Sequence, residues 1–381
     1  MPSIARMPVT VNVTTKRSIV SCADPVALDA SMSACAGSDP LKGELPGKKK
    51  KARTIRSELL VSSVSSKTTI KLHQLPSPSY LNECLLQRYG AKSKVVDFFA
   101  GSGWDGLVPQ VDPLYHLPEK RQLRKRGQLM SMLRAISVMI LSAPSQGTSK
   151  RLVDFCGGAG HVGLLVAYLF SEWEVVCVDR NPISIDLGIR RAQEASLSNF
   201  RTVLGDVLAY EENFDIGTSL HACGAASDYA IKMCEKRSAG LIVASCCVGK
   251  ICAISKRARE SDSPEQLLWK QPKSLELQTS LAEHARATTG KEDRDFMDHC
   301  FDKLTRFADS SESTHFTSLA KYLVELDRLK AVEDRGYTGV LCKMEPTSST
   351  PKNDIVIAWP PHFNIDKNAF GEVRIVETQP T

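Results

Sequence analysis

The residues whose types and spacing could do chemistry stand in one short stretch, 153–161, which reads Val-Asp-Phe-Cys-Gly-Gly-Ala-Gly-His. Glycines at positions 157, 158 and 160 let a backbone turn approach a ligand that any Cβ atom would block. Asp179 ends the next apolar run, where its carboxylate can accept hydrogen bonds from both hydroxyls of a ribose. Together, the turn and the acid indicate a site for a nucleotide-containing cofactor.

The kind of cofactor depends on the residues around the glycines. A phosphate-binding loop is excluded, because the stretch lacks a Gly-Lys-Ser/Thr ending. Gly158, Gly160 and Gly163 fit the dinucleotide pattern Gly-x-Gly-x-x-Gly, so NAD remains an alternative. Asp154, just ahead of the glycines, would repel a pyrophosphate but attract the sulfonium and α-ammonium groups of S-adenosylmethionine. We therefore predict S-adenosylmethionine as the cofactor, against the simpler interpretation of a turn that binds nothing.

A doubly wound α/β sheet is the fold that would bring these residues to one edge. Apolar, β-branched runs that alternate with helical patterns predict parallel strands. Strands are expected at 151–155, 174–178, 200–204, 214–220 and 240–245, with helices at 162–170 and 227–237. Each polar cluster follows a strand, and such sheets bind ligands at the carboxyl ends of their strands. Ser227 and Asp228 are expected to be the cap and the first-turn acid of the second helix.

Several longer strings resemble one known family. They are VDFCGGAGHVG (153–163), FDIGTSLHACGAASD (214–228), SCCVGK (245–250), ELDRLKAVEDRGYTGVLCKMEP (325–346) and TPKNDIVIAWP (350–360). They are similar to the methyltransferase domain of the glutathione S-transferase C-terminal-domain-containing proteins, a domain type that also occurs in tRNA methyltransferases acting on the ribose 2′-hydroxyl. The likeness covers about 104–252 and 316–360 and does not reach the first hundred residues.

This resemblance implies a Rossmann-like class I methyltransferase. Its sheet would have seven strands, mostly parallel, with an antiparallel edge strand. The C-terminal part of the domain would supply a helix at 316–335 and strands at 337–343 and 355–358.

The fold and the resemblance assign roles to individual residues. Asp154 and the glycine turn would hold the methionine portion of the cofactor, Asp179 the ribose and Asp206 the adenine region. His221, after the fourth strand, is the predicted catalytic base, and a hydrogen-bonded core histidine is the alternative. The predicted cofactor-binding residues are Asp154, Cys156, Gly157, Gly158, Gly160, Asp179, Asp206 and His221. The residues expected to line the opposite side of the acceptor edge are Cys246, Cys247 and Lys250.

The acceptor is predicted from one absence and one analogy. The fourth strand lacks the Asp/Asn-Pro-Pro-Tyr/Phe string that is typical of enzymes methylating exocyclic amines, so a hydroxyl acceptor is favoured. The resemblance and the basic N-terminal stretch point to RNA modification, with tRNA as the leading example. The main alternative is a catalytically inactive S-adenosylmethionine-binding protein that serves as an interaction scaffold, because no unambiguous base is evident. An NAD-dependent enzyme is the third interpretation.

The chain has 12 cysteines, which raise the question of metals and disulfides. Several fall inside predicted strands or helices, a scatter that is typical of a reducing compartment. His221, Cys223, Cys246 and Cys247 could converge at adjacent strand ends and hold zinc. However, the usual Cys-x-x-Cys spacing is missing, and adjacent cysteines seldom bind one ion. We therefore predict no metal site.

Composition divides the chain into four parts. We expect a disordered basic tail at 1–66, a pre-domain segment at 67–118, the methyltransferase domain at 119–362 and a C-terminal tail at 363–381. Within the domain, 256–313 reads as a polar insertion that forms a lid or a loop. A second glycine motif at 95–103 is not expected to bind a cofactor, because prolines follow where a helix would be needed. The helix expected at 123–141 starts with basic residues that form a solvated face or contact phosphates, namely Lys120, Arg121, Arg124, Lys125 and Arg126.

Charge and hydropathy narrow the partners and the location. The net charge is +6, and the first 58 residues already carry an excess of five positive charges, so overall charge is no argument for a nucleic-acid-binding fold. No apolar run reaches the ~18 residues of a spanning helix, so no membrane partner is predicted. A cytoplasmic location is expected. The lysine run at 48–51 and the first 20 residues, which contain no acid, keep nuclear and organellar targeting open.

Overall fold

The computed structural model describes most of the chain beyond residue 45. The described residues are 46–68, 70–115, 117–144, 149–251, 272–312, 314–350, 352–371 and 374–375. The chain divides into two units, Met1–Pro46 and Gly47–Thr381, and the account below concerns the second. The expected N-terminal tail lies outside the described residues as far as residue 45.

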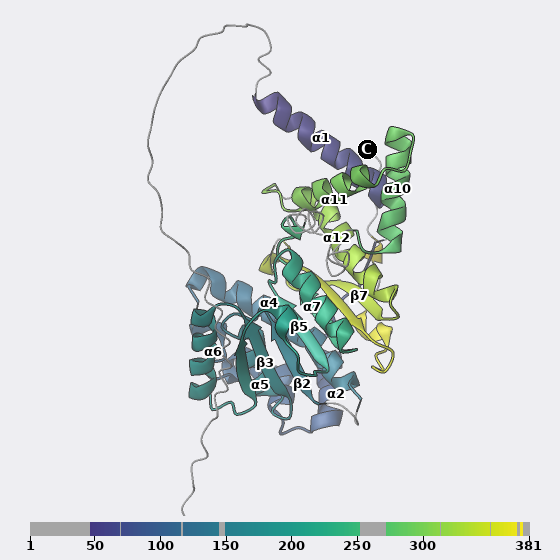
Figure 1. Ribbon diagram of the computed structural model, residues 1–381. Helices are drawn as coiled ribbons and strands as arrows, with labels where there is room; N and C mark the ends of the chain where they lie inside the picture. The colour runs from purple at the N-terminus through teal and green to yellow at the C-terminus, as the bar shows by residue number, and fades with distance from the viewer. Residues whose placement is uncertain are drawn as a thin grey trace, which may run out of the picture. The chain divides into compact units, whose positions relative to one another are not determined.

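A seven-stranded sheet forms the centre of this unit (Figure 1). The strand order is β4-β3-β2-β5-β6-β8-β7, and every strand runs parallel except β8, which pairs antiparallel with both neighbours. The strands are β2 (Arg151–Phe155), β3 (Glu174–Asp179), β4 (Phe200–Leu204), β5 (Ile216–Leu220), β6 (Gly240–Ala244), β7 (Thr338–Lys343) and β8 (Asp354–Trp359). The expected Rossmann-like sheet is confirmed, with its antiparallel strand between β6 and the edge strand β7.

The winding of the sheet reverses beside β2. The chain places β3 and β4 on one side of β2, then crosses to place β5 and β6 on the other side. The register sets Asp154 opposite Cys177 of β3 and Thr218 of β5. Such a reversal leaves a crevice outside the carboxyl ends of the strands, where doubly wound sheets bind ligands. The glycine turn after β2 and His221 after β5 therefore lie at the same edge.

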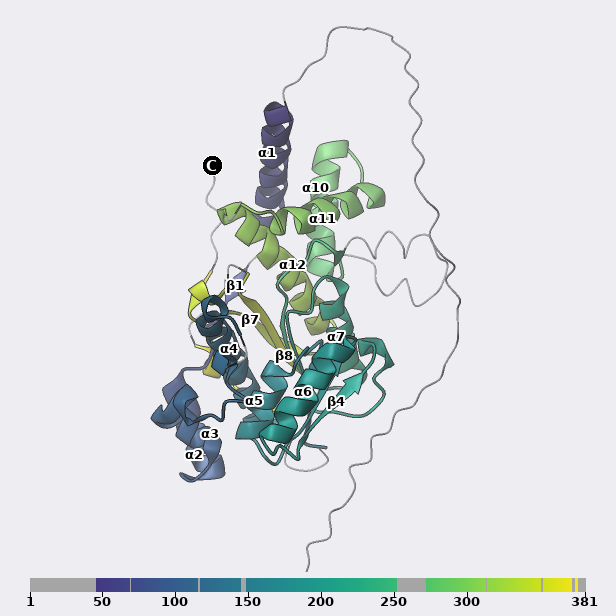
Figure 2. The ribbon, with the colours of Figure 1, turned by 90° about the vertical axis from the view of Figure 1, so that its left-hand side faces the viewer.

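The strands are mostly apolar because both faces of the sheet are covered. On one face, Leu152 and Val175 join a core with α4 (Glu119–Ser142) and α5 (His161–Leu169). On the other, Val153 and Val176 join a core with α7 (Ala225–Lys236) and α12 (His315–Glu333). Neighbouring residues of a strand thus enter different cores, as the two-residue period of a strand requires. In Figure 2, α4 lies to the left of β7 and β8, and α7 lies to their right.

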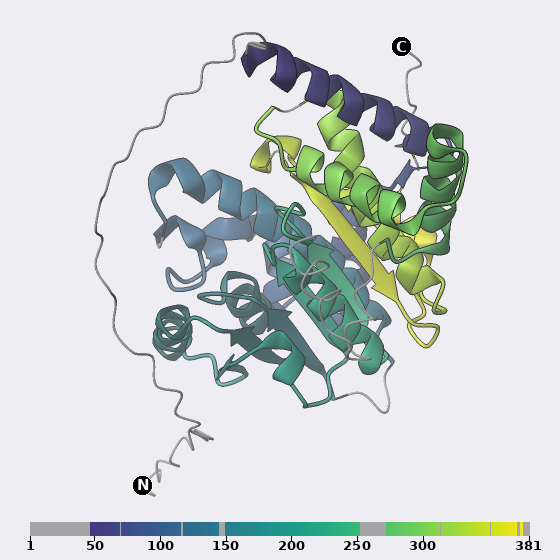
Figure 3. The same ribbon diagram turned by 45° about the horizontal axis from the view of Figure 1, so that its top comes forward.

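The segment expected to be a polar insertion is helical where the structure describes it. α10 (Leu275–Thr289) and α11 (Arg294–Ala308) pack with α12, as Figure 3 shows, and bury Leu277 and Leu281. α1 (Pro46–Ser65), expected to be part of the tail, adds Leu60 and Val64 to the same core. The structure differs from the expectation because apolar residues recur four positions apart within otherwise polar segments. Residues 252–271 of this region lie outside the described residues.

The segments that flank the domain also pack onto it. The second glycine motif forms the short helical turns α3 (Lys94–Asp97), η1 (Phe98–Ser102) and η2 (Gly103–Gly106), with Phe98 and Trp104 in edge-to-face contact at 5.6 Å. In the expected C-terminal tail, Phe370 is buried and stacks on Trp359, and β9 (Arg374–Ile375) pairs with β1 (Lys71–Leu72). The described part of that tail therefore belongs to the fold. Of the helices described, none is both long and apolar enough to cross a membrane.

Candidate cofactor and acceptor site

The turn after β2 has an unusual backbone. Cys156, Gly158 and Gly160 have φ angles of 56°, 58° and 74°, in the left-handed region that side chains disfavour. Gly160 immediately precedes α5, so the chain passes from strand to helix within a few residues. A Cβ atom on Gly157 would lie 2.6 Å from Oδ2 of Asp154. Glycine is therefore required at 157 for packing and favoured at 158 and 160 for conformation.

Asp154 lies beneath this turn and is only 1% exposed. Its Oδ2 accepts a hydrogen bond of 3.1 Å from the backbone N–H of Gly163 in α5. Its Oδ1 is buried and has no hydrogen-bond partner within the described part of the chain. Burial, reinforced by the negative charge of Asp179, raises the pKa of Asp154 to about 7. A buried acceptor without a donor is costly, so this atom marks a place where a ligand could supply the missing donor.

Asp179, at the end of the neighbouring strand β3, holds the glycine turn in place by hydrogen bonding. Its Oδ2 accepts the N–H of Gly158 at 2.9 Å, and its Oδ1 accepts the N–H of Asn181 at 2.8 Å. Asn181 in turn caps α6 (Pro182–Glu194) by accepting the N–H of Ile183 at 3.1 Å. Each carboxylate oxygen has a second lone pair that remains for another donor. Asp179 can therefore hold the turn and a ribose hydroxyl at the same time.

Asp206 lies at the next strand end along the sheet. It caps the short helix η4 (Val207–Ala209) and forms an exposed ion pair of 3.2 Å with Arg180. The negative charges of the three predicted acids all act on the thiol of Cys156. Burial, followed by the charges of Asp179, Asp154 and Asp206, raises the pKa of Cys156 to about 11. The structure thus brings the three carboxylates together around the glycine turn.

His221 occupies the corresponding position after β5. Its φ of 73° also lies in the left-handed region, where a non-glycine residue is strained, and such strain is concentrated at functional sites. Its backbone N–H donates to the carbonyl of Ala244 at 2.9 Å. Its Nε2 lies 3.0 Å from the acceptor Oε1 of Gln128 and donates to it. With Nε2 protonated, a neutral ring keeps its acceptor lone pair on Nδ1.

Two residues of α4 reach this edge: Gln128, which sequence reasoning missed, and Lys125, which it named only as part of a basic face. Gln128 is buried and orients the histidine ring. Lys125 lies one turn earlier in the helix. Burial and the charge of Arg121 lower its pKa to about 8, although the negative charges of Asp154 and Cys246 act in the opposite direction. The basic start of this helix is therefore more than a solvated face. The signal was present, because residues three positions apart share one face of a helix.

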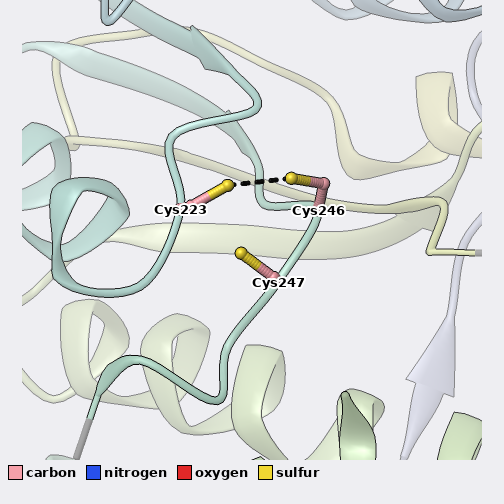
Figure 4. Close-up of side chains that lie close together, drawn as sticks. All are labelled: Cys223, Cys246 and Cys247. Atoms are coloured by element: carbon pink, nitrogen blue, oxygen red, sulfur yellow. Dashed lines mark hydrogen bonds between the residues drawn. The ribbon is translucent and has the colours of Figure 1, made fainter. Parts of the chain in front are cut away.

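Three cysteines gather after the ends of β5 and β6 (Figure 4). The sulfur atoms of Cys223 and Cys246 are 2.9 Å apart, and that of Cys247 lies within 4.8 Å of both. The neighbouring Cys223 thiol and then the His221 ring lower the pKa of Cys246. The spacing along the chain argued against such a group, but the side chains converge in space. Lys250, expected at the same edge, is exposed.

A buried charged network holds the loops that carry these cysteines. Arg328 of α12 donates to Oδ1 of Asp228 at 2.9 Å, to the carbonyl of Gly224 at 3.0 Å and to Oγ of Ser245 at 3.2 Å. Glu325 accepts from the same guanidinium at 3.0 Å. Gly224 follows the first cysteine of the cluster, and Ser245 precedes the second. The C-terminal string at 325–346, which resembles the family, therefore holds these loops in place through Arg328 and Glu325. Its sequence did not reveal this role.

At the start of α7, Asp228 lies in the first turn as expected, but the expected cap, Ser227, was wrong. Gly224, rather than Ser227, precedes the helix, and both Ser227 and Asp228 are buried. The carboxylate of Asp228 serves Arg328 and Lys273, the latter at 2.7 Å, instead of the first amide groups of the helix. A buried cation competes better for a carboxylate than backbone amides do.

The sheet and the acid-lined glycine turn are those of a Rossmann-like nucleotide-cofactor domain. Residues 124–253 match a family described as a methyltransferase domain. This match confirms the resemblance inferred from the motifs: this part of the chain is similar to a methyltransferase domain.

The chain is also similar to curated proteins named glutathione S-transferase C-terminal domain-containing protein. The Bos taurus protein is 29% identical over 68% of this chain and 37% of its own length, and the Homo sapiens protein is 29% identical over 68% and 36%. A Drosophila melanogaster homolog is 27% identical over 67% of this chain and 40% of that protein. The chain thus spans little more than a third of these relatives.

Two solved structures that the chain matches are both methyltransferases by name. The magnesium protoporphyrin IX methyltransferase from Synechocystis PCC 6803 with bound SAH is 13% identical, with a TM-score of 0.35, over 69% of this chain and 97% of that chain. An rRNA methylase from Streptococcus thermophilus is 10% identical, with a TM-score of 0.31, over 61% of this chain and 94% of that chain.

Proposed function

We propose that this chain is an S-adenosylmethionine-dependent methyltransferase whose acceptor is a hydroxyl group of RNA. The observation that carries the proposal is the buried Oδ1 of Asp154, a carboxylate oxygen without a donor beneath a glycine turn. The α-ammonium group of S-adenosylmethionine is a charged donor that suits this atom. The pyrophosphate of NAD would meet a second negative charge there. The methyltransferase-domain match over 124–253 supports the same choice.

The site residues suit successive parts of the cofactor along the sheet edge. We assign the methionine portion to Asp154 and the turn at 156–160, the ribose to Asp179 and the adenine region to Asp206. When bound, S-adenosylmethionine supplies a methyl group on a sulfonium, which is a good leaving group. The protein must then hold the acceptor in line with the S–CH₃ bond and remove the hydroxyl proton.

His221 is the proposed base of this reaction. The methyl group passes to the acceptor oxygen, the electron pair of the broken bond stays on sulfur, and the hydroxyl proton passes to Nδ1 of His221. Gln128 holds Nε2 at 3.0 Å and so fixes which nitrogen is free. The ring now contacts the thiol of Cys246, and the acceptor hydroxyl would replace that contact.

RNA is the proposed acceptor because exposed basic residues lie at the start of α4, the helix whose Lys125 and Gln128 reach the site. Lys120, Arg121 and Arg124 are exposed at the start of α4, within two turns of Lys125, which acts electrostatically on Asp154. Exposed cations near a reaction site suit the phosphates of a nucleic acid. The end of β5 reads Ser-Leu-His, without the string typical of amine methylation, which supports a hydroxyl acceptor.

Cofactor binding and methyl transfer test the proposal in two steps. S-adenosylmethionine and S-adenosylhomocysteine should raise the melting temperature of the full chain, and NAD should not. Labelled methyl groups should then appear in a ribonuclease-sensitive fraction of total RNA. His221→Asn should lose transfer by about a hundredfold or more and keep the thermal shift. Absence of any shift with the sulfur cofactors would reject the proposal, whereas binding without transfer to any extract would leave the inactive scaffold.

Cofactor affinity should rise with pH between about 6 and 7. Asp154 has a pKa of about 7 in the free protein, so below that pH most molecules carry a protonated Asp154. These molecules must lose that proton before the carboxylate can pair with the α-ammonium group. Below that pKa, affinity should increase by up to about tenfold per pH unit, and the rise should level off above about pH 7; near pH 8 an α-amino group loses its own proton and affinity should fall. Isothermal titration of S-adenosylhomocysteine in buffers of different ionisation enthalpy measures both the affinity and the released proton. Adenosine, which lacks the ammonium group, is the control, and an equally steep rise for adenosine would contradict the pairing.

A further inference from the structure

The thiols of Cys223, Cys246 and Cys247 form a cluster that the methyl-transfer roles do not use. We propose that they bind one zinc ion at the acceptor edge, with a fourth ligand position left for water or for an atom of the acceptor. All three sulfur atoms lie within 4.8 Å of one another, and each side chain is half-buried. Figure 4 shows the three side chains pointing toward one another from two loops.

The size of the sulfur triangle suits a tetrahedral thiolate site. A Zn–S bond of about 2.3 Å places two thiolates of such a site about 3.8 Å apart. The distance between Cys223 and Cys246 is 2.9 Å, and the other two distances do not exceed 4.8 Å. A spread of about 1 Å in the closest pair, within reach of side-chain rotation, would give the required spacing. Thiolates also favour zinc over magnesium or calcium, which prefer oxygen.

The adjacency of Cys246 and Cys247 does not prevent both from binding the ion. Side chains of neighbouring residues point to opposite faces only while the chain is a strand, and β6 ends at Ala244. Beyond that point the backbone is irregular, and its Cys247 carbonyl accepts the N–H of Gly224 at 3.1 Å. This bond joins the two cysteine-bearing loops directly.

The loops are held on both sides of the thiols. Arg328 binds the carbonyl of Gly224 and the hydroxyl of Ser245, as described above. Asp309 accepts the N–H groups of Val248 at 3.0 Å and Gly249 at 2.6 Å, just beyond the adjacent cysteines 246 and 247. Metal sites need ligands whose backbone is fixed before the ion arrives. The charged groups of α12 and of the residue after α11 provide that support.

The cluster has three ligands rather than four. Among the residues that the structure describes, no further histidine, aspartate or glutamate atom joins the three sulfur atoms. Structural zinc sites are closed by four protein ligands, whereas catalytic sites have three and keep one position open. Binding would release the protons of the cysteines that are still thiols. The resulting net charge of minus one is balanced in part by Lys125, which acts electrostatically on Cys246.

Metal content tests the proposal directly, without cofactor or acceptor. The full chain, purified under reducing conditions without chelator, should contain about one zinc per molecule by elemental analysis. Cobalt added to the zinc-free protein should give a thiolate-to-metal charge-transfer absorption that saturates at one equivalent. Cys223→Ser and Cys247→Ser should each lose stoichiometric binding, while Cys84→Ser, in α2 (Pro78–Tyr89) and outside the cluster, should keep it.

Any of the following results would contradict the proposed zinc site. A reduced wild-type chain that takes up neither zinc nor cobalt overturns the proposal whatever the variants do, and so does equal uptake by the Cys223→Ser variant. A Cys223–Cys246 disulfide in the isolated protein, with no metal uptake after its reduction, would assign the pair a redox role instead. Because the thermal shift with S-adenosylhomocysteine is measured separately, failure of the metal site and failure of the proposed function are distinguishable.

Discussion

Asp154→Asn should reduce S-adenosylmethionine binding by at least about thirtyfold and leave the protein folded. The buried Oδ1 of Asp154 is the atom to which we assign the α-ammonium group of the cofactor. An amide carries no negative charge, and removing one partner of a buried charge pair costs about 2–5 kcal/mol in binding free energy. Equilibrium dialysis with labelled cofactor measures the change.

The stability of the Asp154→Asn variant separates this effect from misfolding. Burial raises the pKa of Asp154 to about 7, so the contribution of this carboxyl to stability is present below its ordinary pKa of 3.8 and is lost as the pH rises through 7. The amide avoids that loss, and at pH 8 the variant should be at least as stable to urea as the wild type. Asp206→Asn is the matched control, because this acid is half exposed and its loss should weaken binding by about tenfold or less. Unchanged binding by Asp154→Asn would remove the basis of the cofactor assignment.

Arg328→Met should lower the free energy of unfolding by about 3–5 kcal/mol. The guanidinium is 2% exposed and neutralises the buried carboxylates of Asp228 and Glu325. Burial alone would raise the pKa of Glu325, but the charges of Arg328 and Lys321 lower that pKa to about 2. Methionine would leave these carboxylates with less compensation in a dry interior. Urea unfolding followed by circular dichroism at neutral pH measures the difference.

Arg335→Met is the control for the Arg328 substitution. Arg335 lies just beyond α12 and pairs with Glu235, but its side chain is 49% exposed, and surface pairs contribute about 0–1 kcal/mol. Because the pKa of Glu325 is depressed, the stability that depends on its charge is present above about pH 4.5 and is lost as the pH falls through about 2. The difference between wild type and Arg328→Met should therefore shrink in acid. Equal losses for the two substitutions would show that the buried network does not stabilise the loops.

Much of the fold was predictable because it depends on neighbouring residues. The alternation of apolar strands with helical patterns identified the parallel strands, since a strand covered on both faces must be apolar. The turn at 156–160 was predictable because left-handed backbone and close packing both select glycine. Asp154, Asp179 and Asp206 could be placed at one edge without coordinates, since parallel strands that follow one another end on the same side.

The same reasoning failed where partners come from distant parts of the chain. Local composition made α1 look like a disordered tail and α10 like part of a polar insertion, and only the shared apolar core explains the burial of Leu60 and Leu281. Asp228 was expected only as a first-turn acid, and nothing in the sequence indicated that Arg328, a hundred residues later, donates to its carboxylate. Spacing rules for metals likewise consider only positions along the sequence, and so they did not indicate that the sulfur atoms of Cys223, Cys246 and Cys247 lie within 4.8 Å of one another.

The sequence by itself determined the class of sheet, the glycine turn and the three acids around it, because each depends on periodicity or on conformations that few residues adopt. Only the tertiary structure decided that Gln128 orients His221 and that Arg328 supports the loops that carry the cysteines. It also decided that the thiols of Cys223, Cys246 and Cys247 lie together. These contacts join residues from separate elements, and their distances are set by how helices and strands pack. Packing depends on the whole apolar interior, which no local pattern of residues specifies.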